Sequence, residues 1–394
     1  MAASANVFTN KYSEWTPGKR YYGGNAVVDE LEQYCQSLAL QIFNLSWDDR
    51  WVNVQPLSGS VANLAVYTGC LSPGDTILAM GLGSGGHLTH GHPLNASGKY
   101  FNCIPYEVND DGLIDYDAIL LLAIQHRPQC IVAGFSAYSR TIDRSQFSQI
   151  QHILLSEYGH KTLLMADISH IAGLIAGWRG GNPFEYFDIV TTTTHKTLRW
   201  PRGALVYYNR TSMGFGSTPK SQHLWNQIDR GVFPGVQWWP FDHVLVAKSL
   251  AFEEILESDW KWYIDTVIAH AQLFAKTLGE LWRKVITGGT DNHLFMIDVT
   301  TQPGMTGKIA EHTLEMIGLS LNKNMIPHDM RSPLDPSGIR IGTPALTTRG
   351  LGTSEVIALS HIIDAALKHH TDMVLLDQLS QQVQAICHQF PLPY

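Results

Sequence analysis

The central part of the chain, residues 116–209, alternates regularly between two hydrophobic patterns. Short apolar runs rich in β-branched residues alternate with longer segments whose apolar residues recur every three or four positions, so strands are predicted to alternate with helices. Such alternation is typical of parallel strands joined by crossover helices. The predicted helices are 116–126 and 146–158, and the predicted strands are 130–135, 162–166 and the runs beginning at Asp188 and Ala204.

The same patterns extend the prediction in both directions. Helices are predicted at 27–43 and 61–70, and a strand follows the Pro73-Gly74 turn. Residues 233–241 are predicted as a non-helical loop. After this loop we predict helices 242–256, 263–285, 308–317, 353–369 and 373–390 and strands 293–299 and 338–341.

We therefore expect an α/β protein with three parts. Residues 1–24 form an N-terminal segment, residues 25–257 a large domain with a mainly parallel central sheet, and residues 258–394 a smaller α+β domain. In such sheets ligands lie beyond the carboxyl ends of the strands. The polar residues predicted to fall there are Ser136, Asp167, His170 and Lys196.

Composition narrows the classes of function. The chain has 394 residues, of which 44% are hydrophobic and 16% charged, as expected of a protein with a large core, and its formal charge is -8. Because no basic cluster interrupts this negative balance, we expect no nucleic-acid binding. We also expect no membrane span and a cytoplasmic location, because the sequence lacks a long apolar run and a signal-peptide pattern.

The cysteine and histidine residues favour no metal site. The five cysteines are scattered and odd in number, which argues against a disulfide framework and a zinc site and favours a reducing compartment. His87, His90 and His92 lie close together, but no acidic or cysteine cluster accompanies them at a known ligand spacing. We therefore predict no bound metal ion.

Lys196 and Asp167 together point to one coenzyme. Lys196 follows a β-branched run and Asp167 follows an apolar run, so each is predicted at the end of a core strand. Pyridoxal phosphate needs a lysine that forms a Schiff base and a carboxylate that keeps its pyridine nitrogen protonated. The alternative, an ordinary surface lysine, stays open for the lysine segment taken alone.

Three further motifs each allow two interpretations. Ser58-Gly59-Ser60 before a predicted helix is either an anion-binding N-terminus or a plain serine cap. The run GLGSGG at 81–86 matches the dinucleotide fingerprint, but the glycines and Pro93 that follow make a poor helix, which disfavours nicotinamide binding. Arg340 in an apolar strand either binds an anion such as a carboxylate or forms a structural ion pair.

With these motifs in place, the sequence resembles the serine hydroxymethyltransferase family, pyridoxal-phosphate enzymes of the aspartate-aminotransferase-like fold, or fold type I. The resemblance extends from residue 10 to residue 394. It rests on KRYYGG at 19–24, SGS at 58–60, GGHLTHG at 85–91, GFSAYS at 134–139, TTTTHKTL at 191–198, TGGTDNH at 287–293 and SGIRIGTP at 337–344.

The resemblance implies a role for each candidate residue of the large domain. Lys196 would hold the cofactor as a Schiff base, Asp167 would pair with the pyridine nitrogen, and His87 would stack on the ring. His195, next to the lysine, joins Lys196 and His87 among the catalytic candidates. Further cofactor contacts are implied for Ser136, His170, Gly59, Ser60 and Tyr12.

The resemblance also implies how the substrate is bound. Arg340 would bind the amino-acid carboxylate. Tyr12, Glu14 and Tyr22 would reach the active site of a neighbouring subunit in a homodimer, with Glu14 as the proton-transferring carboxylate. The implied reaction makes or breaks the Cα–Cβ bond of a β-hydroxy-α-amino acid through a glycine quinonoid, as in the serine–glycine interconversion of one-carbon metabolism.

Bulky residues distinguish this chain from the family pattern. Trp238 and Trp239 stand where the family has a glycine pair, and Trp200 replaces a glycine after the lysine loop, so the use of tetrahydrofolate is left open. The residues expected to contact folate or to wall the entrance are Tyr21, Leu82, Leu88, Asn324, Trp238 and Trp239. The alternatives are a folate-independent L-threonine-type aldolase or transaldolase of specialised metabolism, and an inactive homologue that acts as an interaction subunit.

Overall fold

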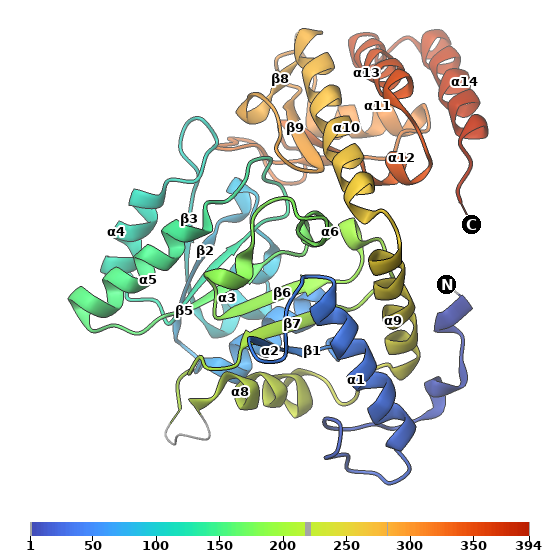
Figure 1. The fold of residues 1–394 in the computed structure, drawn as a ribbon. Coiled ribbons are helices and arrows are strands. Elements are labelled where there is room, and N and C mark those ends of the chain that lie inside the picture. Colours follow the sequence, from blue (N-terminus) through green and yellow to red (C-terminus); the bar gives the residue numbers. More distant parts are fainter. Residues whose placement is uncertain (1, 217–221, 282, 394) are drawn as a thin grey trace.

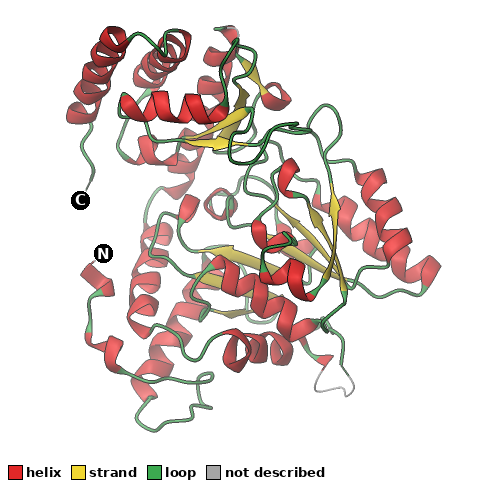
Figure 2. Ribbon diagram, turned by 180° about the vertical axis from the view of Figure 1, so that it is seen from behind, coloured by secondary structure: helices red, strands yellow, loops and turns green. Residues whose placement is uncertain are grey.

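In the computed structural model, which describes residues 2–216, 222–281 and 283–393, the strands form two sheets (Figure 1). The larger sheet has seven strands in the order β1-β7-β6-β5-β4-β2-β3, and the smaller has four in the order β10-β11-β9-β8. Helices cover both faces of the larger sheet, and the smaller sheet lies among the helices near the C-terminus (Figures 1 and 2).

The larger sheet is mainly parallel, which confirms the predicted fold class. β2 pairs in parallel with β3 and β4, and the parallel order continues through β5 to β6. Its strands are β1 (Arg50–Asn53), β2 (Thr76–Met80), β3 (Asn102–Tyr106), β4 (Cys130–Gly134), β5 (Leu163–Asp167), β6 (Ile189–Thr193) and β7 (Ala204–Asn209).

The strand β7 is an antiparallel member of this mainly parallel sheet. β7 is antiparallel to both β6 and β1. The connection 194–203 holds only the 3-10 turn Lys196–Leu198. A parallel connection needs a crossover of a dozen or more residues, so this short connection joins β6 and β7 as an antiparallel pair.

Helices follow the predicted positions closely, with two corrections. The helices around the larger sheet are α1 (Ala26–Gln41), α2 (Gly59–Cys70), α3 (Ala96–Tyr100), α4 (Tyr116–His126), α5 (Arg144–Tyr158), α6 (Ala172–Ala176), α8 (Leu224–Arg230) and α9 (Asp242–Glu257). The predicted loop 233–241 begins inside a single π-helical turn, Gly231–Val236, although Phe233 and Pro234 have non-helical backbone angles. The predicted helix 263–285 ends at Glu280, because Lys284–Val285 pairs with β9.

The C-terminal elements surround the smaller sheet. Its strands are β8 (Lys284–Val285), β9 (Leu294–Asp298), β10 (Asn322–Asn324) and β11 (Gly338–Gly342). The helices of this part are α10 (Trp260–Glu280), α11 (Gly307–Met316), α12 (Pro344–Thr348), α13 (Thr353–Lys368) and α14 (Met373–Gln389). Within the described ranges, no helix combines the length and apolar character needed to cross a membrane.

Apolar side chains on both faces of the larger sheet are buried. On β2, Ile77 and Ala79 pack in a cluster with α2, whereas Leu78 and Met80 pack in a second cluster on the opposite face. A sheet covered on both faces explains why its strands are continuous apolar runs in the sequence.

The helix α10 contributes to two hydrophobic cores. Ile264 and Val267 in its first half belong to the core of the larger sheet. Phe274 and Leu278 in its second half belong to the core of the smaller sheet. This continuous helix therefore connects the two parts of the molecule (Figure 1).

Candidate active site

Polar residues gather at the carboxyl ends of the parallel strands, as the sequence predicts. Asp167 is the last residue of β5, Ser136 follows β4, and Lys196 follows β6. The pKa of Lys196 responds to the charges of both Asp167 and Arg340, so these three side chains share one electrostatic environment. This edge of an α/β sheet is where ligands bind.

Asp167 is held by hydrogen bonds on both carboxylate oxygens. Its side chain is 8% exposed, Oδ2 accepts from Asn63 Nδ2 at 2.8 Å, and Oδ1 accepts from the backbone N–H of Ser169 at 3.0 Å. Burial alone would raise the pKa of Asp167, but the hydrogen bond and charge of His90 and the bonds from Asn63 and Ser169 lower it well below its usual range. Asp167 is therefore a buried acid that stays ionised.

Two histidines beside Asp167 have their tautomers fixed by the 3-10 turn Leu88–His90. Nδ1 of His90 accepts the backbone N–H of His87 at 3.2 Å, so Nε2 carries the hydrogen and donates to Asp167 at 3.2 Å. Nδ1 of His87 accepts the backbone N–H of Thr89 at 3.2 Å and lies 2.8 Å from the Thr89 hydroxyl. Burial is the main cause that lowers the pKa of His87.

Asn63 on α2 connects these groups, and sequence reasoning missed it. Its Nδ2 donates to Asp167 and, at 2.9 Å, to the hydroxyl of Thr89, while its Oδ1 accepts from the hydroxyl of Thr191 at 2.7 Å. Asn63 is 1% exposed, so these bonds satisfy a buried amide. The sequence signal that could have found it is an asparagine on the apolar face of the predicted helix 61–70.

Lys196 has a strained backbone conformation, and its amine forms no hydrogen bond with the described residues. Its φ is 64°, in the left-handed region that residues other than glycine seldom adopt. Burial is the main cause that lowers the pKa of Lys196, Asp167 opposes this effect, and Arg340 and Arg202 add to it. Among the described residues, Nζ of Lys196 has no hydrogen-bond partner.

Arg340 on β11 is half-buried, and no acidic side chain among the described residues pairs with its guanidinium group. Nε donates to Asn322 Oδ1 at 3.1 Å and Nη1 donates to the backbone oxygen of Ser136 at 2.5 Å. Burial lowers the pKa of Arg340, and within the described ranges no carboxylate forms an ion pair with it. The structural ion pair considered for Arg340 is thus absent from this part of the chain, and an anionic ligand fits its free Nη2.

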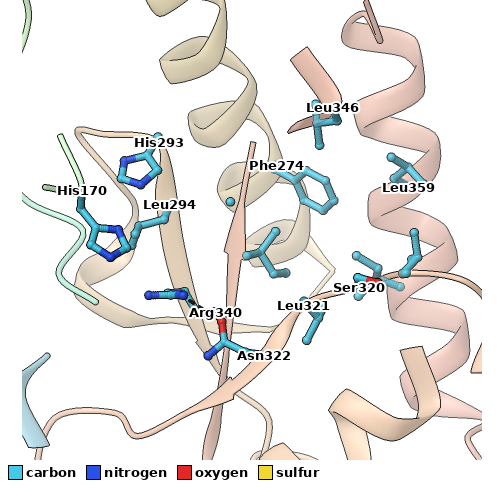
Figure 3. A pocket seen from close by; sticks show the side chains of 14 residues that line it. His170, Phe274, His293, Leu294, Ser320, Leu321, Asn322, Arg340, Leu346 and Leu359 are labelled. Carbon is cyan, nitrogen blue, oxygen red and sulfur yellow. Dashed lines mark hydrogen bonds between the residues drawn. The ribbon is translucent and has the colours of Figure 1, made fainter. Parts of the chain in front are cut away.

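Two stacked histidines adjoin Arg340 (Figure 3). The rings of His170 and His293 lie 5.7 Å apart at an interplanar angle of 24°. Burial, with the charges of Lys196 and Arg340 adding to it, lowers the pKa of His293 to about 3 and that of His170 well below its usual value. Both Nδ1 atoms are buried without a hydrogen-bond partner in the described part of the chain, so each is open to a hydrogen bond with a ligand or a water molecule.

The N-terminus of α2 approaches the same region. Ser58 caps the helix by accepting from the backbone N–H of Val61, which leaves the N–H groups of Gly59 and Ser60 without a partner among the described residues. A Cβ at Gly59 would lie 2.7 Å from Cγ2 of Thr193, so this position needs glycine for α2 to approach β6 closely. The serine cap and the free amide groups are present together.

His195 and Trp200, on either side of the lysine turn, have different neighbours. His195 lies 3.4 Å from Arg202 through Nε2, and burial, with the charges of Lys196 and Arg202, lowers its pKa to about 4. The ring of Trp200 stacks on Trp260 of α10, with centroids 6.3 Å apart, and packs against the core of the larger sheet.

The N-terminal candidates form a separate aromatic cluster. Tyr12 contacts Trp239 at 4.5 Å and Tyr22 at 6.0 Å between ring centroids, and Tyr22 contacts Tyr21 at 5.1 Å. Glu14 nearby is 5% exposed. No hydrogen bond, ion pair or ring contact within the described ranges joins this cluster to Lys196.

The remaining candidates for a folate site or an entrance wall are mostly exposed. Trp238 is 57% exposed and its ring meets Phe233 at 5.9 Å, while Leu82 and Leu88 are also at the surface. Asn324 on β10 donates to the backbone oxygen of its neighbour Met325 at 2.5 Å. Within the described ranges, no group of three or more His, Cys, Asp or Glu side chains is arranged to hold a metal ion.

Comparison with known families adds an independent finding. The model of the family described as serine hydroxymethyltransferase matches residues 1–363, which is most of the chain. This family consists of pyridoxal-phosphate-dependent transferases of fold type I that are usually linked to folate, and the two-sheet α/β architecture described above is the fold of that family. The chain therefore belongs to the serine hydroxymethyltransferase family.

Proposed function

We propose that the protein is a pyridoxal-phosphate enzyme that makes or breaks the Cα–Cβ bond of a β-hydroxy-α-amino acid, as in serine–glycine interconversion. The observation that carries this proposal is Arg340, a half-buried guanidinium with no acid partner among the described residues, in the electrostatic environment of Lys196 and Asp167. This arrangement suits a ligand with a carboxylate and a carbonyl-reactive coenzyme.

Several features of the described residues fit the coenzyme. Lys196 has a free amine for its aldehyde, and Asp167 is an ionised acid for its pyridine nitrogen. The free N–H groups of Gly59 and Ser60 at the start of α2 suit its phosphate. The unsatisfied Nδ1 of His170 suits a polar group of the ring. We propose His87 as the residue that covers the ring face.

Each residue then has a physical task. When bound, pyridoxal phosphate supplies a ring that accepts the electrons of the Cα–Cβ bond. The lowered pKa of Lys196 keeps more of its amine uncharged near neutral pH, which is the form that reacts with carbonyl groups. Arg340 binds the substrate carboxylate and so orients the bonds of Cα. Asp167 supplies the fixed negative charge.

Glu14, Tyr12 and Tyr22 enter the proposal through a homodimer. We propose that a second copy of the chain brings its N-terminal segment to the site described here, where Glu14 moves a proton to or from the β-hydroxyl group. Within the described ranges these N-terminal residues contact one another and Trp239 but form no hydrogen bond, ion pair or ring contact with Lys196 of their own chain, which is consistent with shared active sites.

A second candidate is a folate-independent aldolase or transaldolase. Trp239 against Tyr12 and the exposed Trp238 favour it, because two indoles occupy space that the family pattern leaves open. An assay of glycine formation from L-serine, with and without tetrahydrofolate, separates the two. A strict need for folate supports the transferase, whereas unchanged turnover without folate and better use of L-threonine reject it.

The third hypothesis, an inactive homologue, is tested by whether the protein binds the coenzyme. Purified protein supplemented with pyridoxal phosphate should show the visible absorbance of the lysine-bound coenzyme, and the Lys196→Ala variant should not. Absence of this band in the native chain would favour an interaction subunit. A cytoplasmic location is part of our proposal, and the five free cysteines support it because disulfides are rare in that compartment.

A further inference from the structure

On the β10 side of β11, the smaller sheet has no paired strand beyond Arg340. β10 pairs with β11 only from Asn324 and Gly338 to Asn322 and Arg340, whereas β9 stays paired with β11 as far as Gly342. The chain before Asn322 therefore leaves β11 at Arg340, and Ile341 and Gly342 have no strand beside them on that side.

Gly342 presents its backbone to this opening. The N–H of Thr343 donates to the backbone oxygen of His293 on the β9 side. Hydrogen-bonding directions alternate along an antiparallel strand, so Gly342 directs its own N–H and C=O away from β9, toward the open edge. Gly342 is exposed, as an open edge requires.

A cavity of about 300 Å³ occupies this opening. Its polar side is lined by Arg340, Asn322, His170 and His293, and its apolar side by residues of α10, α12 and α13. In Figure 3 the side chains of His170, His293 and Arg340 lie together, apart from those of Phe274, Leu346 and Leu359. The cavity is thus polar at one end and apolar at the other.

The polar end and the apolar end of the cavity suit different parts of one ligand. At the polar end, Arg340 has no acid partner and the buried Nδ1 of His293 has no hydrogen bond among the described residues. Both histidines have lowered pKa values and are uncharged near neutral pH, so the charge lining the cavity is that of Arg340. A carboxylate satisfies this end, whereas an ammonium group would be repelled.

We propose that this cavity binds a monocarboxylic acid with a short apolar tail. The carboxylate pairs with Arg340, the chain passes the open edge at Gly342, and the tail lies among Phe274, Leu346 and Leu359. The acid therefore competes with the amino-acid substrate for Arg340, and only this competition rests on the proposed function. The ligand class is broader than the substrate, because the apolar chamber lies beyond the carboxylate site.

The first test compares ligands that differ in one part. Titration calorimetry on the full chain should give a dissociation constant that falls by about fourfold for each methylene buried, from acetate through butanoate to hexanoate. Hexan-1-ol and hexylamine, which lack the carboxylate, should bind at least tenfold more weakly than hexanoate. Equal affinities for acetate and hexanoate would overturn the proposal.

The second test blocks the opening beside Gly342 with a larger side chain. A Cβ at Gly342 meets only ordinary contacts, 3.6 Å to the His293 oxygen being the shortest, so Gly342→Val adds bulk without a clash. Gly342→Val should weaken hexanoate at least tenfold and leave acetate unchanged. Gly279→Val on α10, whose Cβ meets only Val285 at 3.8 Å, is the matched control and should change neither.

Two further measurements keep the outcomes distinct. If circular dichroism shows that Gly342→Val does not fold, Leu346→Asn, which makes the chamber polar, must give the same selective loss of hexanoate binding. Unchanged hexanoate binding in a folded variant overturns the cavity proposal. Glycine titrated into coenzyme-loaded protein is the separate arm: glycine binding with no preference for hexanoate over acetate rejects the cavity alone, and absent glycine binding rejects the proposed function.

Discussion

His90 donates a hydrogen bond from Nε2 to Oδ2 of Asp167 across 3.2 Å. The other ring nitrogen of His90 is held by a backbone N–H, so the donor cannot move to that side without breaking a second bond. Together with Asn63 and Ser169, this donor keeps a buried carboxylate charged. The charge at position 167 is thus built into the fold of the chain before any ligand binds.

The first prediction concerns the pH dependence of stability. The folded-state pKa of Asp167 is lowered, so its stabilisation is fully present above the unfolded-state pKa of about 4 and is lost as pH falls below it. Asp167→Asn should therefore cost about 1–3 kcal/mol in the free energy of unfolding, constant from about pH 5 to pH 8. Urea titrations of both proteins measure this cost. A cost that already shrinks at pH 6 would contradict the prediction.

The second prediction concerns Asn63. Asn63→Leu removes the partner of Thr89, Asp167 and Thr191 and should cost about 1–3 kcal/mol, because buried polar groups are left unpaired. Chemical unfolding monitored by circular dichroism gives the value. Asn102→Ala is the control, since the exposed side chain of Asn102 donates a hydrogen bond to the Thr76 hydroxyl at the surface, and its cost should stay within about 0.5 kcal/mol.

The third prediction concerns the reactivity of Lys196 in coenzyme-free protein. Arg340→Met removes a charge that lowers the pKa of Lys196, so the lysine should react with an acylating reagent only at higher pH. Asp167→Asn removes a charge that raises this pKa, so the shift should have the opposite sign. Mass spectrometry of the peptide containing Lys196 follows the reaction. Shifts of the same sign in both variants would contradict the shared electrostatic environment.

The fourth prediction tests shared active sites by mixing inactive chains. Lys196→Ala and Glu14→Gln should each be poorly active, but refolding them together should restore about a quarter of native sites, because a mixed dimer holds one intact site. Serine cleavage measures the recovery. Lys196→Ala mixed with Asp167→Asn is the control and should recover nothing, since both residues belong to one chain's site. Equal results for both mixtures would place Glu14 in its own chain's site.

Strand ends could be predicted from the sequence, whereas contacts between elements could not. Ser136, Asp167 and Lys196 were placed because apolar runs mark where β4, β5 and β6 stop. The bond from His90 to Asp167 depends on how a 3-10 turn packs against β5, which no local pattern encodes. The sequence pattern around His90 does not indicate this hydrogen bond.

Gly59 shows the same limit at a single residue. The family resemblance implies a cofactor contact for Gly59, and the fold adds a packing reason for a glycine there, because its missing side chain makes room for Thr193 on β6. The direction of β7 is a further case, because strand patterns predict extended backbone and the length of the connection decides whether it runs parallel or antiparallel.

The helix α10 limits how the molecule can move. Its first turns are fixed in one core by Ile264 and Val267, and its later turns in the other by Phe274 and Leu278. Any swing that carries Arg340 toward or away from Lys196 must either bend this helix between positions 267 and 274 or slide one set of its side chains within a packed core. A helix anchored in both cores therefore opposes a large change in the spacing of these two residues.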